Sequence, residues 1–574
     1  MLSFKYLHDA ITKHGHTDFS FHQAKDKTRA ISWIELQNNY ITLANEFLKM
    51  DLPEKPVIGI LSSTRYEWSI SDFAIQSIEG ITVGLYKNDR DSVISNCLDQ
   101  TCPSLLILES YEDLKRIQAI DSDWGWLKPV VIMDSHPIGS PPIYHFQSLL
   151  KKGISNSEYT NIALRISQQD QDRISSYIFT SGTSGQPKAT VLSSKNLIHS
   201  ALCYSENYQV NSQDSTILYL PFSHVFSRVM FYASILWGQK HHYLTNIENL
   251  PVEMKRVNPS ILLVVPRLLE KAMSKISEGL IEKNIFERTL FKMAIYIGRN
   301  RNLDFKNGLL TSTLYPILDK LVLKKLRQIF GSNLKFMGAG GGRLNKTTAD
   351  FFWSIGLPIY EGYASTETGG LGIFNHPKNF KTGSIGMPSP AVNWKIEDDN
   401  ELIIQSPSNA LGYLNNGQVD MFDTWLPTGD IAYVDKQGFI SIKDRKKDIF
   451  VSAYGKNIAP GWIEEQFKQS QYIDDIVIAG DEKPFLTALI VASENFKKHK
   501  NLAEIIQKEV LDINKKLSRH ETLKSFRLIE EFSIDNATMT STFKKRRTTI
   551  LNHYQDKIDS MYPNSDQTIS ALLN

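Results

Sequence analysis

Hydrophobic patterns in the first half of the chain alternate between two kinds of spacing. Apolar residues recur at helical spacing over residues 33–50 and 65–79, which predicts two amphipathic helices. Short unbroken apolar runs at 56–61 and 81–86 predict buried strands. Helices that alternate with short buried strands are typical of βαβ units. We therefore expect an α/β fold in which helices cover largely parallel sheets.

The pattern changes twice further along the chain. Residues 267–330 have an almost entirely helical pattern with Lys, Arg and Glu on the polar face, which indicates a helical insertion. An amphipathic helix at a membrane surface is the alternative interpretation. Short strands and turns predict a β-rich subdomain at 388–446. We expect an N-terminal part, 1–446, of two αβ-layered subdomains plus this β-rich subdomain, then a small α+β domain at 447–563 and a polar tail at 564–574.

Composition narrows the functional classes. The 574 residues include 64 Lys and Arg against 62 Asp and Glu, a net charge of +2, which argues against a protein that coats nucleic acid. Cys97, Cys102 and Cys203 are too few for a disulfide framework or a four-cysteine zinc site. The N-terminus has no apolar signal segment, and the longest apolar run, 261–266, falls far short of the roughly 18 residues of a membrane span. We expect a cytoplasmic protein, soluble or peripheral at a membrane.

The sharpest chemical signal is the segment SYIFTSGTSGQPKATVL at residues 176–192. A short apolar strand leads into Thr, Ser and Gly residues, whose backbone N–H groups and hydroxyls can surround a phosphate, and a lysine adds positive charge. The segment differs from the P-loop of NTPases because Pro187 stands where that motif needs glycine. A flexible Ser/Gly linker is the alternative. The candidate ATP ligands are Thr180, Ser181, Gly182, Thr183, Ser184, Gly185 and Lys188.

This loop resembles the signature of the adenylate-forming (AMP-binding) enzymes, which include acyl-CoA synthetases. Four further family elements follow in the expected order: YEGYASTET at 360–368, WLPTGD at 425–430, DRKKDIFVSAYGKNIAP at 444–460 and STFKKRR at 541–547. Within the family the best match is with long-chain fatty acyl-CoA synthetases, which YLPFSHVFSRVM at 219–230 and the helical insertion also resemble.

The resemblance implies a two-step ligase reaction. A fatty acid carboxylate attacks the α-phosphorus of ATP with Mg²⁺ present, which gives acyl-adenylate and pyrophosphate, and the thiol of coenzyme A then displaces AMP. Two alternatives stay open: transfer of the acyl group to a carrier protein, and a nucleotide-binding module without turnover. A third interpretation takes KKRR as a nucleic-acid patch. Oligomeric state is left open by the sequence.

The resemblance also assigns roles around the nucleotide. Glu367 is the expected Mg²⁺ ligand, Thr366 is expected to contact the α-phosphate, and Tyr363 is expected against the adenine. The glycine-rich segment GAGGGRL corresponds to the family's adenine loop, in which Gly341 and Gly342 allow close approach of the backbone to the flat base.

Three charged positions complete the expected adenylation machinery. By resemblance, Asp430 accepts hydrogen bonds from the ribose hydroxyls, and Arg445 reaches the same sugar. Lys544 is the expected catalytic lysine, whose ammonium offsets charge on the acid and the α-phosphate. Lys545 is the alternative, because the basic run leaves the register open. Lys447 falls at the family's hinge, so the resemblance implies a mobile C-terminal domain.

The remaining candidates concern the thiol and the acyl chain. Ser452, Gly455 and Lys456 lie where the family binds CoA, and Tyr454 replaces a glycine usual there, so it is expected to narrow the thiol tunnel or suit another acceptor. His224 is expected to act in catalysis and as a gate of the acyl pocket, and Trp237 is a second gate candidate. A buried core position is the alternative for both gates.

Overall fold

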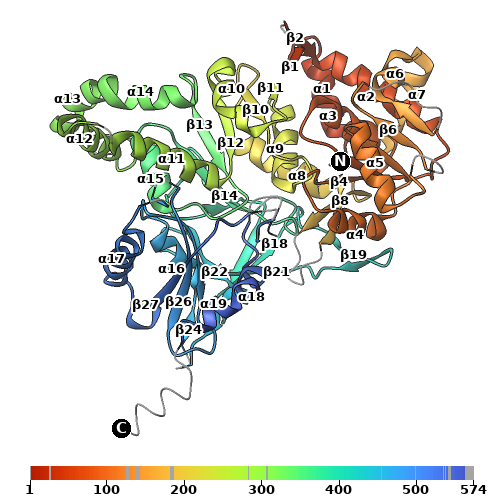
Figure 1. Cartoon of the computed structure of the whole chain (residues 1–574). Coiled ribbons are helices and arrows are strands. Elements are labelled where there is room, and N and C mark those ends of the chain that lie inside the picture. The colour runs from red at the N-terminus through yellow and green to blue at the C-terminus, as the bar shows by residue number, and fades with distance from the viewer. Residues whose placement is uncertain are drawn as a thin grey trace. The chain divides into compact units, whose positions relative to one another are not determined.

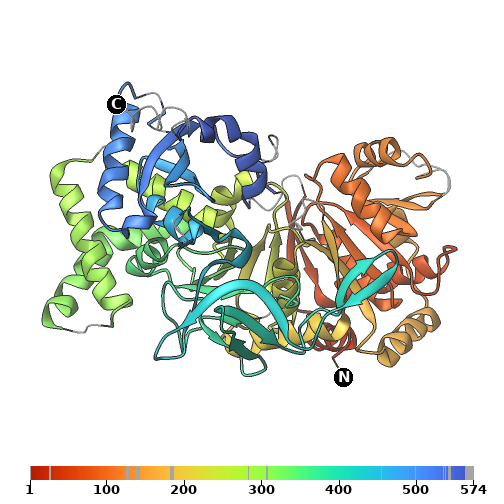
Figure 2. The same cartoon turned by 90° about the horizontal axis from the view of Figure 1, so that it is seen from below.

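The computed structural model describes residues 2–24, 27–124, 128–135, 142–180, 187–281, 283–305, 308–370, 372–453, 456–494, 496–497, 499–533, 536, 538–540 and 544–562. The chain forms two compact units. The first consists of Met1–Trp394 and Ile404–Leu426, and the second of Lys395–Ile403 and Pro427–Asn574. Figures 1 and 2 show both units from directions 90° apart. The domain boundary expected at residue 446 stays a prediction.

The first unit contains two nine-stranded sheets. In spatial order, one consists of β20 (Gln418–Met421), β19 (Gly412–Asn415), β9 (Lys188–Ser193), β8 (Ile174–Thr180), β4 (Ile81–Leu85), β3 (Val57–Leu61), β5 (Leu105–Leu108), β6 (Val130–Ile132) and β7 (Ile143–His145). The strands from β8 to β7 are parallel, whereas β9, β19 and β20 add an antiparallel edge. The parallel pairing expected from the βαβ pattern is therefore present.

Helices cover both faces of this sheet. Val83 of β4 packs in a cluster with residues of α4 (Asp91–Thr101) and α5 (Tyr111–Ile120). The neighbouring Thr82 points the other way and donates a hydrogen bond of 2.7 Å to Asp72 of α3 (Tyr66–Ser77). Such alternation follows from the two-residue period of a strand. The other helices near this sheet and the N-terminus are α1 (Lys5–His14), α2 (Trp33–Leu48), α6 (Phe146–Lys151) and α7 (Asn156–Gln168).

The second sheet supplies most of the candidate site. Its order is β16 (Met387–Pro388), β15 (Ile373–Phe374), β14 (Ile359–Tyr363), β13 (Phe336–Ala339), β12 (Ile261–Val264), β10 (Ser215–Leu218), β11 (Lys240–Tyr243), β1 (Asp18–Ala24) and β2 (Lys27–Ser32). The strands from β14 to β1 are parallel. Helix α8 (Ser194–Asn207) leads from β9 of the first sheet into β10, and α9 (Val225–Leu236) and α10 (Leu250–Val257) connect β10, β11 and β12.

Residues 266–330 are mainly helical, and they appear in green as neighbouring helices in Figure 1. They form α11 (Pro266–Ile281), α12 (Ile285–Asn302), α13 (Leu309–Leu318), a π turn (Asp319–Leu323), α14 (Lys324–Arg327) and a 3₁₀ turn (Gln328–Phe330). Ala294, Ile297 and Leu323 pack with Phe352 of α15 (Lys346–Ser354) in one buried cluster. None of the described helices is long and apolar enough to cross a bilayer.

The second unit is an α+β structure. A four-stranded sheet at its start has the order β17 (Asn393–Ile396), β18 (Glu401–Gln405), β21 (Leu426–Val434) and β22 (Ile440–Arg445). A three-stranded sheet follows, with β25 (Ile473–Ala479), β26 (Leu486–Ala492) and β27 (Leu523–Ile529). Its two faces pack against different helices, α16 (Pro460–Phe467) and α17 (Leu502–Asn514) on one, α18 (Arg547–His553) and α19 (Gln555–Asp559) on the other. A short hairpin, β23 (Phe450–Val451) and β24 (Asn457–Ile458), precedes α16.

Candidate functional site

The predicted phosphate loop joins two antiparallel strands. Thr180 ends β8 and lies opposite Lys188, which begins β9. Ser181, Gly182, Thr183, Ser184 and Gly185 lie outside the described residues. The ammonium of Lys188 lies 5.1 Å from the ring centroid of Tyr413, within the range of a cation–π contact.

Tyr413 also contacts the predicted metal ligand. Its hydroxyl donates a hydrogen bond of 2.7 Å to Oε1 of Glu367. The tyrosine reaches both partners because β19 pairs with β9, opposite Thr190. The backbone of Glu367 is held as well, since its carbonyl accepts a 2.8 Å bond from Ala410 N–H. A neutral hydroxyl orients the carboxylate without neutralising it. Tyr413 was missed in the sequence because only long-range strand pairing places it here.

Two further predicted site segments follow adjacent parallel strands and begin at the same edge of the second sheet. Gly341 and Gly342 follow β13, and Tyr363 ends β14, its neighbour in the sheet. Gly341 has a φ of +77°, which an L residue with a Cβ rarely adopts. Thr366 is buried in the turn after β14, where its carbonyl accepts a 2.9 Å bond from Gly369 N–H. The carboxyl edge of a parallel sheet is where such folds bind ligands.

His224 is the N-cap residue of α9. Its Nδ1 accepts a hydrogen bond of 3.2 Å from the backbone N–H of Phe226, which satisfies one of the helix's first donors. The Phe226 ring lies against Gly340, where an added Cβ would approach ring carbons to 2.9 Å. The predicted gate residue therefore fixes the start of the helix whose first turn meets the glycine-rich loop.

A buried arginine anchors this region to the first sheet. Arg228 is fully buried, and its guanidinium donates to the Ser176 hydroxyl of β8 and, over 3.2 Å, to the carbonyl of Phe222. Its guanidinium also lies 4.8 Å from the Trp68 ring centroid. Ser223 adds a 2.9 Å bond to the carbonyl of Leu85 in β4. Arg228 lies in the segment YLPFSHVFSRVM, but the sequence pattern did not predict that its side chain is buried.

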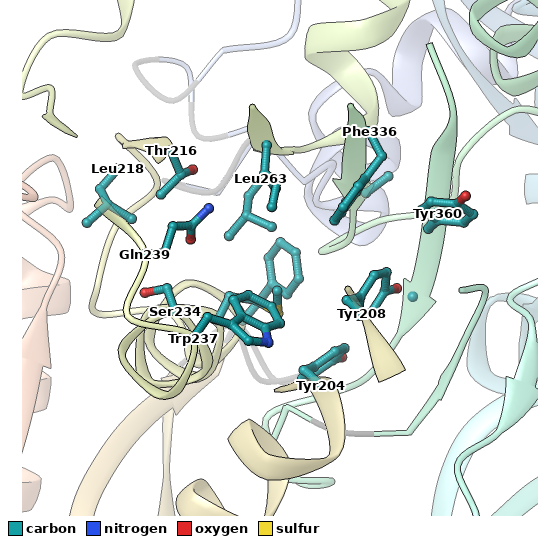
Figure 3. A pocket seen from close by; sticks show the side chains of 16 residues that line it. Tyr204, Tyr208, Thr216, Leu218, Ser234, Trp237, Gln239, Leu263, Phe336 and Tyr360 are labelled. Atoms are coloured by element: carbon teal, nitrogen blue, oxygen red, sulfur yellow. The ribbon is translucent and has the colours of Figure 1, made fainter. Parts of the chain in front are cut away.

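An apolar pocket lies between the second sheet and helices α8 and α9 (Figure 3). Residues of β10, β12, β13 and β14 line one wall. The other is lined by Phe226, Met230 and Ser234 of α9 and by Trp237 at its end. The space in and around the pocket, counting parts open to solvent, is about 560 Å³. The Trp237 indole donates a 3.0 Å bond to the carbonyl of Ser205, which holds its ring in the lining.

In the second unit, the predicted ribose residues face one another on paired strands. Asp430 of β21 is opposite Arg445 of β22, and Nε of the arginine lies 2.8 Å from the buried carboxylate. Thr428 shapes the turn before Asp430, because its hydroxyl donates to the carbonyl of Leu402 over 2.7 Å and accepts from the Asp430 N–H over 3.2 Å. The pair is thus held in position within this unit.

The predicted hinge and thiol residues occupy turns. Lys447 lies in an exposed 3₁₀ turn, Lys446–Asp448, and the ammonium of Lys446 is 2.6 Å from carboxylate oxygens of both Asp399 and Glu401. Ser452 and Lys456 close the next hairpin, where the Ser452 N–H donates to the Lys456 carbonyl over 3.0 Å. Tyr454 and Gly455 lie outside the described residues.

The two candidate catalytic lysines have different surroundings. The ammonium of Lys545 donates to Glu464 (2.9 Å), Asp475 (3.0 Å) and the carbonyl of Ile476 (2.6 Å). Burial opposes ionisation of Asp475, yet the charge of Lys545 brings its pKa below the ordinary value. Lys544 is exposed at a turn, where its backbone carbonyl accepts a 2.8 Å bond from Thr540 N–H. Lys545 therefore belongs to a buried ion network.

Known proteins resemble this chain along almost its whole length. The model of the AMP-binding enzyme family matches residues 8–414, and that of the AMP-binding enzyme C-terminal domain matches residues 447–566. A long-chain-fatty-acid–CoA ligase of Mycobacterium bovis is 28% identical over 538 residues, which cover 88% of this chain and 88% of that protein.

Solved structures share the fold. An anthranilate–CoA ligase in complex with anthranoyl-AMP has a TM-score of 0.77 and 16% identity, covering 97% of this chain and 99% of that chain. The o-succinylbenzoate–CoA synthetase of Bacillus subtilis, in complex with ATP and magnesium, has a TM-score of 0.68 and 17% identity, covering 95% and 98%. These likenesses confirm the predicted α/β fold with a smaller C-terminal part.

The ion network gives a stability prediction. Lys545→Met leaves Glu464 and Asp475 short of a cation, and breaking such a buried pair costs about 3 kcal/mol. We expect faster hydrogen exchange at the amides of β25 and β26 in the full chain. Lys544→Met is the matched control, with unchanged exchange because Lys544 is exposed. Equal effects of the two substitutions would contradict the distinct positions of the lysines.

Proposed function

The chain belongs to the AMP-binding enzyme family, and from this we propose that it is an ATP-dependent long-chain fatty acid–CoA ligase. The observation that carries the proposal is the apolar pocket, which reaches Ala339 and Gly362 at the sheet edge where the glycine-rich loop and the Thr366–Glu367 turn begin. An acid with its tail in this pocket would present its carboxylate to a nucleotide at that edge. The named relative from Mycobacterium bovis supports a long-chain acid as substrate.

The reaction would proceed in two displacements. A carboxylate oxygen attacks the α-phosphorus of ATP, the bond to the β-phosphate breaks, and pyrophosphate leaves. The CoA thiol then attacks the acyl carbon, loses its proton and displaces AMP. The first step brings anions together, so it depends on cations and N–H donors around the phosphates. In the first unit, Lys188, next to the phosphate loop in the chain, and Thr366 would contribute.

The contacts of Glu367 support its proposed role as a magnesium ligand. Mg²⁺ is usually held by one or two carboxylates together with substrate phosphates and water. Glu367 supplies such a carboxylate, oriented by Tyr413, whose ring also contacts the phosphate-loop lysine. Bound there, Mg²⁺ would neutralise phosphate charge. Tyr413 would keep the carboxylate in this orientation as the nucleotide enters.

The second unit would contribute the ribose contacts and the catalytic cation. Asp430 would accept from the ribose hydroxyls, and Arg445, already bonded to it, would hold the carboxylate in place. We assign catalysis to Lys544, because the ammonium of Lys545 is engaged by two carboxylates and a carbonyl. Movement about Lys447 would then present the face of Ser452, Gly455 and Lys456 to CoA.

The remaining predicted roles concern entry of substrates. The adenine would lie against Tyr363 and the backbone of Gly341 and Gly342, at the same edge. His224 caps α9 and so controls the placement of Phe226, a lining residue. Trp237 lies at the opposite end of the same helix and also lines the pocket. We therefore assign His224 to the entrance of the acyl pocket and Trp237 to its far part.

We also propose a cytoplasmic enzyme that contacts membranes through the outward face of α12. Ile285, Phe286, Met293 and Tyr296 on this helix are between 40% and 82% exposed. Exposed Lys292 lies on the same stripe. Large exposed apolar side chains interspersed with cations are typical of helices that lie at lipid surfaces. A lipid surface would also hold the fatty acid substrate.

The function is tested by pyrophosphate release from ATP and Mg²⁺ with medium- and long-chain fatty acids, with and without CoA. We expect release that depends on the acid, is lost without Mg²⁺ and is accelerated by CoA. Release indifferent to CoA but stimulated by acyl-carrier protein would favour the carrier as acceptor, and would focus attention on Tyr454. An absence of release with every acid would overturn the ligase assignment.

A second prediction separates the two steps. Lys544→Ala should slow formation of acyl-adenylate by a factor on the order of 10²–10³, the usual effect of removing one preorganised stabilising group. Thioester formation from preformed acyl-adenylate and CoA should persist. Lys524→Ala, at another exposed lysine of the same unit, is the control and should leave both steps unchanged. An equal loss in both steps would show that Lys544 has a different role.

Membrane contact is tested by sedimentation with vesicles that contain anionic phospholipid. The double substitution Ile285→Ser and Phe286→Ser should markedly reduce the bound fraction, because it removes the two most exposed apolar side chains of α12. The control is Val252→Ser, which replaces an apolar residue of α10 that is 66% exposed on a different helix. Binding that is the same in both variants would exclude α12 as the contact.

A further inference from the structure

The apolar pocket has two chemically different ends. Toward the carboxyl ends of the strands lie Ala339 and Gly362, next to the predicted nucleotide loops. The opposite end is a layer in which Thr216, Ile261 and Phe336 are in register across β10, β12 and β13. Phe336 lies three residues before Ala339 on β13, about 10 Å at the rise of a parallel strand. This layer is therefore the distal end for a chain that enters beside the nucleotide.

Polar side chains gather at this distal end. Helix α9 begins at His224 near the carboxyl edge and ends near Trp237, so its last turn brings Ser234 to the distal layer. Gln239 follows, tied to the helix by a 3.0 Å bond from its N–H to the carbonyl of Ser234. Figure 3 shows Thr216, Gln239 and Ser234 together on the left side of the pocket, across from Tyr360.

Two of these groups lack hydrogen-bond partners. The Thr216 hydroxyl and Nε2 of Gln239 are buried, in residues that are 3% and 2% exposed, and neither is bonded to any residue that the structure describes. Buried polar groups in folded proteins are nearly always bonded to protein, water or ligand. Because both residues line the pocket, whatever occupies its distal end is their available partner.

Three other hydroxyls of the lining are already bonded. The hydroxyls of Tyr204 and Tyr208 donate to the carbonyls of Gly370 (3.1 Å) and Asn375 (2.6 Å). Ser234 bonds to the carbonyl of Phe231 and to Nε2 of His241. Among the described lining residues, Thr216 and Gln239 are thus the two whose fully buried polar atoms lack a partner.

The surroundings also define the charge of the missing partner. No Asp, Glu, Lys or Arg is among the described residues that line the pocket. Burial lowers the pKa of His241, behind Ser234, to about 3, so this imidazole is neutral at physiological pH. A charged group would meet no counter-ion here and would be costly to bury. The partner is therefore a neutral oxygen group, since a carbonyl or hydroxyl oxygen can accept from Gln239 and from the Thr216 hydroxyl.

We propose that the pocket selects fatty acids whose tail carries a neutral oxygen function, a hydroxyl or carbonyl, at its distal end. The inference rests on the proposed function for the identity of the acid. The carboxylate lies at the nucleotide edge, the methylene chain lies along the sheet, and the tail oxygen bonds to Gln239 and Thr216. An unsubstituted chain leaves both groups unpaired, as an unfilled polar subsite does in enzymes that discriminate against deoxy analogues.

The test compares matched acids of one chain length, each spanning the roughly 10 Å from the nucleotide edge to the distal layer, one with a terminal hydroxyl and one without. Their affinities for the full chain are measured by calorimetry, and their kcat/KM values by pyrophosphate release. We expect the hydroxylated acid to be favoured roughly two- to tenfold, the usual effect of one net hydrogen bond. Gln239→Leu and Thr216→Val, which preserve most of the volume, should remove or reverse this preference. Tyr208→Phe, at a lining residue whose hydroxyl is bonded elsewhere, should keep the ratio.

The outcomes separate this inference from the ligase assignment. Equal binding of the two acids, or a ratio that Gln239→Leu and Thr216→Val leave unchanged, would overturn the polar subsite while turnover continued to support the ligase. A binding preference that these substitutions abolish, without any pyrophosphate release, would support the subsite and overturn the ligase. Preferred binding of the unsubstituted acid would show that water alone satisfies Thr216 and Gln239.

Discussion

Parallel strand pairing is the constraint on which the candidate site depends. Because β10, β12, β13 and β14 run in one direction, their following loops emerge at one edge of the sheet. The glycine-rich loop and the Thr366–Glu367 turn therefore become neighbours although they are separate in sequence. The same pairing stacks alternate side chains into layers, which gives the pocket a direction along the strands. The direction of the strands thus orients both nucleotide and acyl chain.

Antiparallel pairing at the edge of the other sheet adds a second kind of link. Strand β9 follows the phosphate loop, and β19 binds beside it, so Tyr413 reaches both Lys188 and Glu367. Arg228 makes a comparable connection between the start of α9 and β8. In each case one side chain contacts two segments of the chain and fixes their relative positions. Fixed positions of this kind are what preorganisation contributes to catalysis.

Local patterns in the sequence anticipated much of this structure. Helical spacing at 33–50 corresponds to α2, and the short apolar runs correspond to β3 and β4, because period and burial are local properties. The ordered motifs identified the family for the same reason. Sequence reasoning could not find Tyr413 or the spare polar groups at Thr216 and Gln239, since these depend on long-range pairing. The sequence likewise could not distinguish Lys544 from Lys545 as the catalytic lysine. The structure separates them because Glu464 and Asp475 pair with Lys545.

The contact between Phe226 and Gly340 has an evolutionary consequence. A Cβ at position 340 would lie 2.9 Å from the aromatic ring, so a side chain there would force the Phe226 ring to move. Homologues that reshape the acyl pocket with a smaller residue at 226 gain freedom to vary at 340. Residues 226 and 340 would therefore vary together when the substrate changes within the lineage. The residue at 340, in the nucleotide loop, would then correlate with the acid that each enzyme accepts.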